Sequence, residues 1–282
     1  MNNSKITSFM KKIGFKKSNQ SNKSSTFLKC SNNFTIKMPF FMINCNIHKQ
    51  RLEKFKKYAK KANIEYCRLS CVNGKKFNNN IIHKMYNHNP QIIKKSDLTP
   101  IEVSIVISHI NAWLKILASP YDYGIVCEDD AELRVSFKSN VNLVLKELES
   151  HKIKFDILFL WNGNWNKTKS FLEQVLRINK KINIKRETEN FTPGTVCYII
   201  TKKFIKKILQ DILPINKSVD VFLGSYYKKA RMLTVEMKYN KTKKCYMSPF
   251  FTTGAWVCGG DWGTGNTTQN YDVPDIRQII EQ

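Results

Sequence analysis

Three consecutive acidic residues, Glu128, Asp129 and Asp130, directly follow an apolar segment at 123–127. Such a segment is typical of a buried β-strand, and the ligands of open parallel sheets gather beyond the carboxyl ends of the strands. Because alternate side chains of a strand share a face, we expect Glu128 and Asp130 on one side and Asp129 on the other. Two carboxylates on one face suit a hard divalent cation such as Mn²⁺ or Mg²⁺. Such an ion neutralises a departing diphosphate, as sugar transfer from a nucleotide sugar requires.

The plain alternative is a run of acids in a solvated turn. The chain has only 22 Asp and Glu residues against 47 Lys and Arg residues, so three adjacent acids after a buried strand favour a functional site. The pattern alone does not select the enzyme class, because kinases, phosphatases and nucleotidyltransferases also place acids at strand ends.

The elements around these acids predict an α/β fold. The first strand, helix and strand in chain order are typical of a parallel βαβ unit. Residues 1–36, rich in Ser, Asn and Lys, are expected to form a disordered basic tail, and residues 37–282 a single domain. We expect strands at 39–45, 64–69, 123–127, 155–161 and 194–201, and helices at 49–62, 98–119, 137–149 and around 204–209.

The formal net charge of +25 is compatible with nucleic acid, an anionic membrane surface or phosphorylated small molecules as ligands. Lysines on solvated faces, in a chain also rich in Asn and Ile, explain most of it. Ile6, Phe9, Met10 and Ile13 have the spacing of an amphipathic helix that would make peripheral contact with an anionic membrane. A disordered tail is the preferred interpretation.

The sequence has neither an apolar run of about 20 residues nor an N-terminal secretory signal. We therefore expect a cytoplasmic protein, membrane-peripheral at most. The eight cysteines are even in number, but Cys45, Cys127 and Cys197 lie in apolar strand-like segments where a thiol acts as a small hydrophobe. We expect buried or incidental thiols in a reducing compartment.

The order of motifs resembles glycosyltransferase family 25, which includes lipooligosaccharide and collagen hydroxylysine galactosyltransferases. Four stretches across residues 39–223 carry the resemblance. They are Ile43-Asn44-Cys45-Asn46 with Arg51; Leu98-Thr99-Pro100-Ile101-Glu102 with Ser108, His109 and Trp113; Ile125 to Asp130; and Gly194 to Thr201 with Val219-Asp220.

The resemblance implies a GT-A type fold, a Rossmann-like open sheet flanked by helices. It also implies a UDP-sugar donor, with UDP-galactose the commonest, a divalent metal (Mn²⁺ or Mg²⁺) and inversion at the sugar carbon. Glu128 and Asp130 are assigned to the metal, and Asp129 to the donor sugar or ribose. The chain departs from the family pattern at Asn46, Ile47, Ile101 and Ser104, which puts donor contacts at the first loop in question. The other implied donor-binding residues are Asn44, Arg51, Ser108 and His109.

Arg51 is equally well read as a solvated helix charge, and His109 as a packing residue; Trp113 is expected in the core. An inverting transfer needs a base for the acceptor hydroxyl. Asp220 is the first candidate and Asp261 the second, although each is also a natural helix cap or turn acid. The aromatic faces of three tryptophans in polar loops, Trp161, Trp165 and Trp262, are open to two readings, sugar stacking and core packing.

Two other functions compete with the transferase, whose acceptor would be a glycan, a glycolipid or hydroxylysine. The first is a basic nucleic-acid-binding protein, supported by net charge alone, since the sequence has no recognised nucleic-acid motif; no specific nucleic acid is expected as a partner. The second is a degenerate transferase fold that binds sugar without turnover, suggested by the altered first motif.

Overall fold

The computed structural model describes residues 38–71, 74, 98–161, 172–187, 194–240 and 245–252. The predicted tail at 1–36 lies outside these residues, and so do Asp261, Trp165 and Trp262. The strands are β1 (Phe40–Asn44), β2 (Cys67–Ser70), β3 (Tyr123–Glu128), β4 (Ile157–Phe159), β5 (Leu172–Arg177), β6 (Asn183–Glu187), β7 (Cys197–Thr201), β8 (Met232–Val235), β9 (Lys238–Asn240) and β10 (Cys245–Met247). The helices are α2 (Lys49–Lys61), α4 (Pro100–Ala118), α5 (Phe137–Ser150), α7 (Lys202–Asp211) and α8 (Val219–Gly224).

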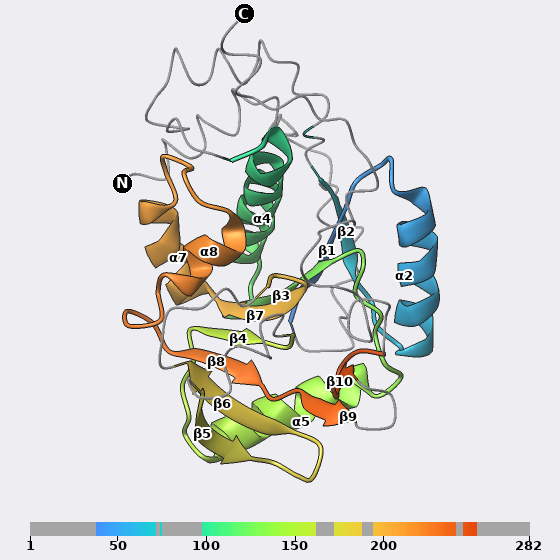
Figure 1. Ribbon diagram of the computed structural model, residues 1–282, viewed down its shortest axis with the longest axis vertical. Coiled ribbons are helices and arrows are strands. Elements are labelled where there is room, and N and C mark those ends of the chain that lie inside the picture. Colours follow the sequence, from blue (N-terminus) through green and yellow to red (C-terminus); the bar gives the residue numbers. More distant parts are fainter. Residues whose placement is uncertain are drawn as a thin grey trace, which may run out of the picture.

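Eight strands form one mixed sheet in the order β2-β1-β3-β7-β4-β8-β6-β5 (Figure 1). β1, β2 and β3 are parallel, β7 is antiparallel to both β3 and β4, and β8 is parallel to β4. The strands β1, β2, β3, β4 and β8 therefore all end at one edge of the sheet. We call it the carboxyl edge, and the opposite one the amino edge.

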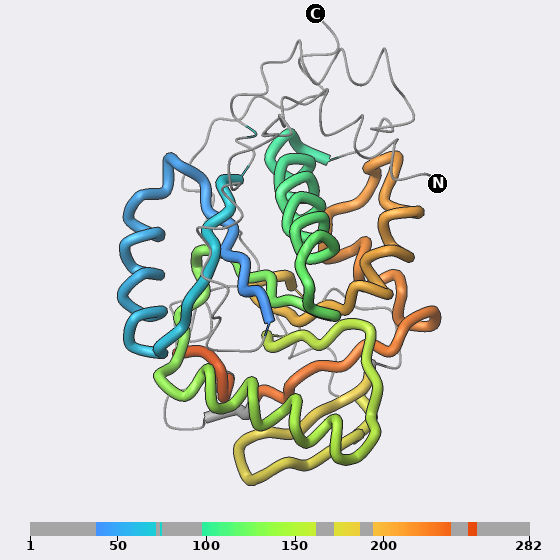
Figure 2. Tube along the Cα trace, turned by 180° about the vertical axis from the view of Figure 1, so that it is seen from behind, coloured from blue at the N-terminus to red at the C-terminus, as the bar shows by residue number. Residues whose placement is uncertain are grey.

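Helices cover both faces of the sheet, because each central strand is apolar on both sides (Figures 1 and 2). In β1, Phe41 and Ile43 pack with α4, α7 and α8, whereas Phe40 and Met42 pack with α2 and α5. The predicted α/β class, a Rossmann-like open sheet flanked by helices, is confirmed. The antiparallel β7 and the hairpin of β5 and β6 were not predicted.

Helix α4 positions much of the carboxyl edge. Thr99 and Glu102 form a reciprocal capping box, and Pro100 occupies the first turn, as the predicted helix entry required.

The helix is long and apolar enough to cross a membrane by length and composition alone. It packs against the sheet with α7 and α8, and Trp113 is fully buried, so α4 is a core helix of this fold.

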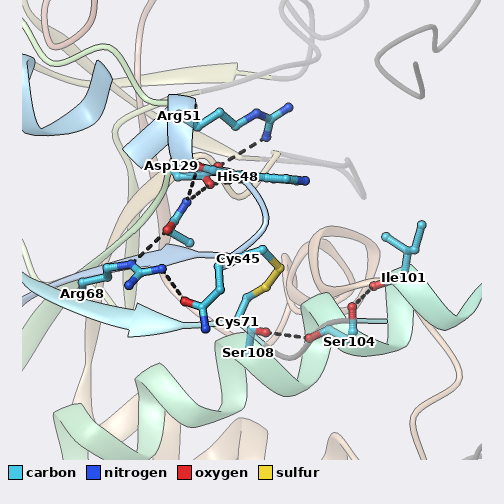
Figure 3. Close-up of a disulfide and its surroundings, with 11 residues drawn as sticks. Cys45, His48, Arg51, Arg68, Cys71, Ile101, Ser104, Ser108 and Asp129 are labelled. Carbon is cyan, nitrogen blue, oxygen red and sulfur yellow. Dashed lines mark hydrogen bonds and ion pairs between the residues drawn. A yellow bond between two sulfur atoms is a disulfide. The ribbon is translucent and has the colours of Figure 1, made fainter. Parts of the chain in front are cut away.

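The expectation of free thiols is wrong at the first two strands. Cys45 follows β1, Cys71 follows β2, and a disulfide joins them with their Cα atoms 4.7 Å apart (Figure 3). Parallel pairing brings both strand ends to the same edge, which the separate strand patterns did not reveal. Cys127 and Cys197 are free and buried, as expected. Disulfides persist in oxidising compartments, so the cysteines no longer support the predicted reducing compartment.

Cys45→Ser and Cys71→Ser should each lower the free energy of unfolding by about 3.5 kcal/mol, the loop-closure value for a separation of 26 residues. The double variant should lose no more than either single one, because the bond is already absent. Urea unfolding of the three variants measures this coupling. Fully additive losses would mean that the two residues stabilise the fold as separate thiols.

Candidate active site

The three predicted acids lie at the carboxyl edge, and their side chains contact different elements. β3 ends with Glu128, whose backbone N–H donates to the Val196 carbonyl across the β3–β7 pair. The Glu128 Oε1 atom accepts a hydrogen bond from Thr195 Oγ1 at 2.6 Å, and His109 Nε2 lies 3.4 Å from it. Glu128 is thus held between α4 and the start of β7.

Asp129 faces the end of β1 and the start of α2 (Figure 3). Its Oδ2 accepts from Asn44 Nδ2 at 2.5 Å, and its Oδ1 lies 3.3 Å from Arg51 Nη1. The Asn44 Oδ1 atom accepts from Arg68 Nε at 2.9 Å, so both ends of this amide are used. The predicted donor-binding residues Asn44, Arg51 and Asp129 are therefore brought together.

Asp130 is the acid with the least compensation. Its Oδ1 atom is buried and has no hydrogen-bond partner among the described residues. Loss of hydration, followed by the negative charge of Glu128, raises the pKa of Asp130 to about 7. Burial also acts to raise the pKa of Glu128, but the nearby His109 imidazole, the hydrogen bond from the Thr195 hydroxyl and the positive charge of Arg51 together hold it below its usual value.

These carboxylates fit a divalent cation in part. Among the described residues, no group of three or more His, Cys, Asp or Glu side chains is arranged to hold a metal ion. Asp130 nevertheless offers a buried carboxylate oxygen without a partner, with a second carboxylate, Glu128, acting on it. An oxygen ligand pair of this kind suits Mg²⁺ or Mn²⁺, which take their remaining ligands from water and substrate phosphates.

A buried hydrogen-bond chain supports Glu128 from behind. Trp113 Nε1 donates to the Tyr198 hydroxyl oxygen at 2.8 Å, and that hydroxyl lies 2.8 Å from His109 Nδ1. Burial raises the pKa of Tyr198 well above its ordinary value, so the phenol keeps its proton and can donate it to Nδ1. In the neutral form of the imidazole, this places the proton of His109 on Nε2, which lies 3.4 Å from Glu128 Oε1.

This hydrogen-bond chain joins side chains from three separate segments of the sequence. His109 and Trp113 are one helical turn apart on α4, Tyr198 lies in β7 with Thr195 just before it, and Glu128 ends β3. Trp113 was expected in the core, which the structure confirms, and no role was expected for Tyr198 or Thr195. The sequence gives only a weak signal for these two residues. Each is a polar group in an apolar segment, and its hydrogen-bond partner lies more than 60 residues away.

The remaining predicted residues are less directly placed. Ser108 donates to the Ser104 carbonyl within α4. Asp220 lies in the first turn of α8, where its Oδ1 accepts from Ser218 Oγ at 2.6 Å and from the Val221 N–H at 2.9 Å. Trp161 is 8% exposed and packs edge-on against Phe251, so the core-packing reading holds for it. The proposed roles of Ser108 and Asp220 stay predictions.

Tyr198→Phe should lower the free energy of unfolding by about 2–4 kcal/mol, because it leaves both Trp113 Nε1 and His109 Nδ1 buried without a partner. Tyr226→Phe is the matched control. It removes a hydroxyl that bonds Asp211 at 2.5 Å, and because Asp211 is exposed, water can replace it, so about 1 kcal/mol is expected.

Nitrogen-15 NMR of wild-type protein should in addition show His109 protonated at Nε2 and unprotonated at Nδ1. A wild-type Nδ1 that carries the proton, or a Tyr198→Phe loss no larger than that of the control, would contradict the hydrogen-bond chain.

The sequence of the chain matches a known protein family. The family model of glycosyltransferase family 25 (LPS biosynthesis protein) matches residues 37–223. Procollagen galactosyltransferase 1-A of Xenopus laevis is 26% identical over 214 residues, and procollagen galactosyltransferase 1 of Danio rerio is 25% identical over 214 residues. Each match covers 73% of this chain and 34% of the relative, so the chain spans about a third of these relatives' length. The chain belongs to glycosyltransferase family 25.

Proposed function

We propose that this chain transfers a hexose, with galactose favoured, from a UDP-sugar to a hydroxyl group of a glycan, glycolipid or hydroxylysine-type acceptor. The reaction would need Mn²⁺ or Mg²⁺, proceed with inversion and use a GT-A type fold. The observation that carries the proposal is the buried, unpartnered Asp130 oxygen beside Glu128 at the carboxyl edge, where open α/β sheets bind their ligands. Family membership and the galactosyltransferase relatives support the reaction class.

Asn44, Arg51 and Asp129 are suited to hold the nucleotide half of the donor. The Asp129 carboxylate is 8% exposed and neutralised by Arg51, whose side chain is 41% exposed. The guanidinium has five N–H donors in a fixed fork, and the contact with Asp129 uses one of them. The others remain available for a ribose or phosphate oxygen, while Asp129 keeps the fork oriented.

Glu128 and Asp130 are suited to hold the divalent ion. When bound, such an ion would neutralise the diphosphate and so make UDP a better leaving group. Thr195 and His109 keep Glu128 ionised and fixed in direction. Asp130, with a pKa of about 7, has the higher cost of ionisation, and a cation beside it would remove that cost.

In the transfer itself, the acceptor hydroxyl oxygen forms a bond to the anomeric carbon as the bond from that carbon to the UDP oxygen breaks. UDP leaves with the bonding electron pair, and the hydroxyl proton passes to a carboxylate base. Asp220 is our first candidate for that base and Asp261 the second. Ser218 and the Val221 N–H both bind Asp220 Oδ1, which leaves Oδ2 to accept the proton.

Asp130→Asn should lower UDP release from UDP-galactose with Mn²⁺ by on the order of 100-fold or more, as expected for the loss of several kcal/mol of charge stabilisation. A chelator should do the same to the wild type. Asp122→Asn removes one acid just before β3, at the amino edge, and should leave release unchanged. Near-normal release by Asp130→Asn would remove Asp130 from the metal role.

The melting temperature at pH 8 separates this loss from unfolding. At that pH the wild-type Asp130 is ionised at a desolvation cost, because its folded pKa of about 7 lies above its usual value. Asp130→Asn should therefore melt at the same temperature or higher. A lower melting temperature would mean that the carboxylate stabilises the fold.

A further inference from the structure

A cavity of about 490 Å³ opens at the amino edge of the sheet, between α7 and the segment that leads into β8. Asp156 directly precedes β4 and Arg231 directly precedes β8, and β4 runs parallel to β8. Since both strands point toward the carboxyl edge, this cavity lies at the far edge of the sheet from Glu128, Asp129 and Asp130. It is no part of the candidate active site.

Five of its eight lining residues are cationic. Lys203 and Lys207 stand one turn apart on α7, and Lys228, Lys229 and Arg231 come from the segment before β8. The single acid, Asp156, is already satisfied, because its two carboxylate oxygens accept from the Arg231 backbone N–H at 2.8 Å and from the guanidinium at 3.0 and 3.2 Å. The lining therefore carries five positive charges against one negative charge, although Lys203 also interacts electrostatically with Asp156.

Among the described residues, acids outside the cavity do not pair with these lysines either. Lys207 Nζ donates to the Lys229 carbonyl at 2.6 Å and lies over the Tyr226 ring, and Lys228 lies over Tyr227. Within the described part of the chain, none of the cavity lysines forms an ion pair with a carboxylate. Their Coulomb repulsion is thus left for a bound anion to relieve.

Scatter of lysines over a chain of charge +25 is the competing explanation. Scattered lysines would be expected on convex, solvated surfaces, where water and salt screen them. Here two separate segments bring four of them to one concavity, and low-dielectric walls focus their field. Buried aromatic rings, Phe204 and Tyr226, pack edge-on beneath α7 at 5.4 Å and fix the two segments relative to each other.

We propose that this cavity binds a phosphate group that carries two negative charges. Lysine ammonium groups bind phosphate as mobile point charges, and the volume falls in the range of small-molecule sites. A second concavity shares Arg231 and adds Lys152, Lys154 and Arg186, the last of which pairs with Glu173 at 3.7 Å, so an excess of positive charge continues toward β5 and β6. The phosphate could belong to a free ion or to a lipid headgroup, which present the same chemistry.

Calorimetry in 150 mM salt with inorganic phosphate, and flotation with phosphatidic acid vesicles against phosphatidylcholine vesicles, test the two sources. The test variant is Lys203→Gln with Lys229→Gln. The control is Lys57→Gln with Lys60→Gln, two exposed lysines of α2, which changes the net charge equally. We expect at least a tenfold loss of affinity in the test variant and less than a twofold loss in the control.

Saturable phosphate binding lost only in the test variant supports the cavity with a free phosphate ligand. Vesicle binding lost only in the test variant, with weak binding of inorganic phosphate, supports the cavity with a lipid headgroup. Equal losses in both variants, or no binding in either arm, overturn the proposal. The cavity lysines are exposed, so melting temperatures near that of the wild type will confirm that both variants fold.

Discussion

The candidate site depends on how the fold compensates three carboxylates at the end of a buried strand. An ionised group taken out of water is costly unless charges or hydrogen bonds replace its hydration. Asp129 accepts a hydrogen bond from Asn44 and pairs with Arg51. Glu128 accepts a hydrogen bond from Thr195 and lies close to the His109 ring. Asp130 obtains no hydrogen-bond partner for its inner oxygen among the described residues. A site that satisfies two acids and leaves the third short of compensation favours a cation beside the third.

The sheet topology supplies these partners from distant parts of the chain. β1 pairs with β3 in parallel, which places Asn44 beside the strand end, and β7 pairs with β3 in antiparallel register, which places Thr195 there. The disulfide of Cys45 and Cys71 fastens the ends of β1 and β2 next to Asn44. Tyr198 and Trp113 support Glu128 indirectly. They orient His109, which in turn lies against Glu128.

Much of this arrangement could be predicted from local sequence. The apolar segment before the acids, the capped helix entry at Thr99 and the strand predicted at 194–201 all have strong local signals, and each element is present, the last as Cys197–Thr201. Strand alternation was expected to place Glu128 and Asp130 on one face, but β3 ends at Glu128, and Asp129 and Asp130 lie in the turn that follows. The direction of β7, the β5–β6 hairpin and the pairing of Cys45 with Cys71 depend on long-range contacts, for which single segments carry no signal. Tyr198 was missed for the same reason, since its two partners lie 85 and 89 residues away.

The central claim is that Asp130 meets a divalent ion that also binds the donor diphosphate. A crystal structure of the protein with UDP and Mn²⁺ tests it most directly. We predict a divalent ion bound next to Asp130 and Glu128, with the UDP diphosphate beside it, since carboxylate and phosphate oxygens are the ligands that such ions prefer. UDP bound at the carboxyl edge with no ion near Asp130, or an ion held only by other residues, would contradict the claim.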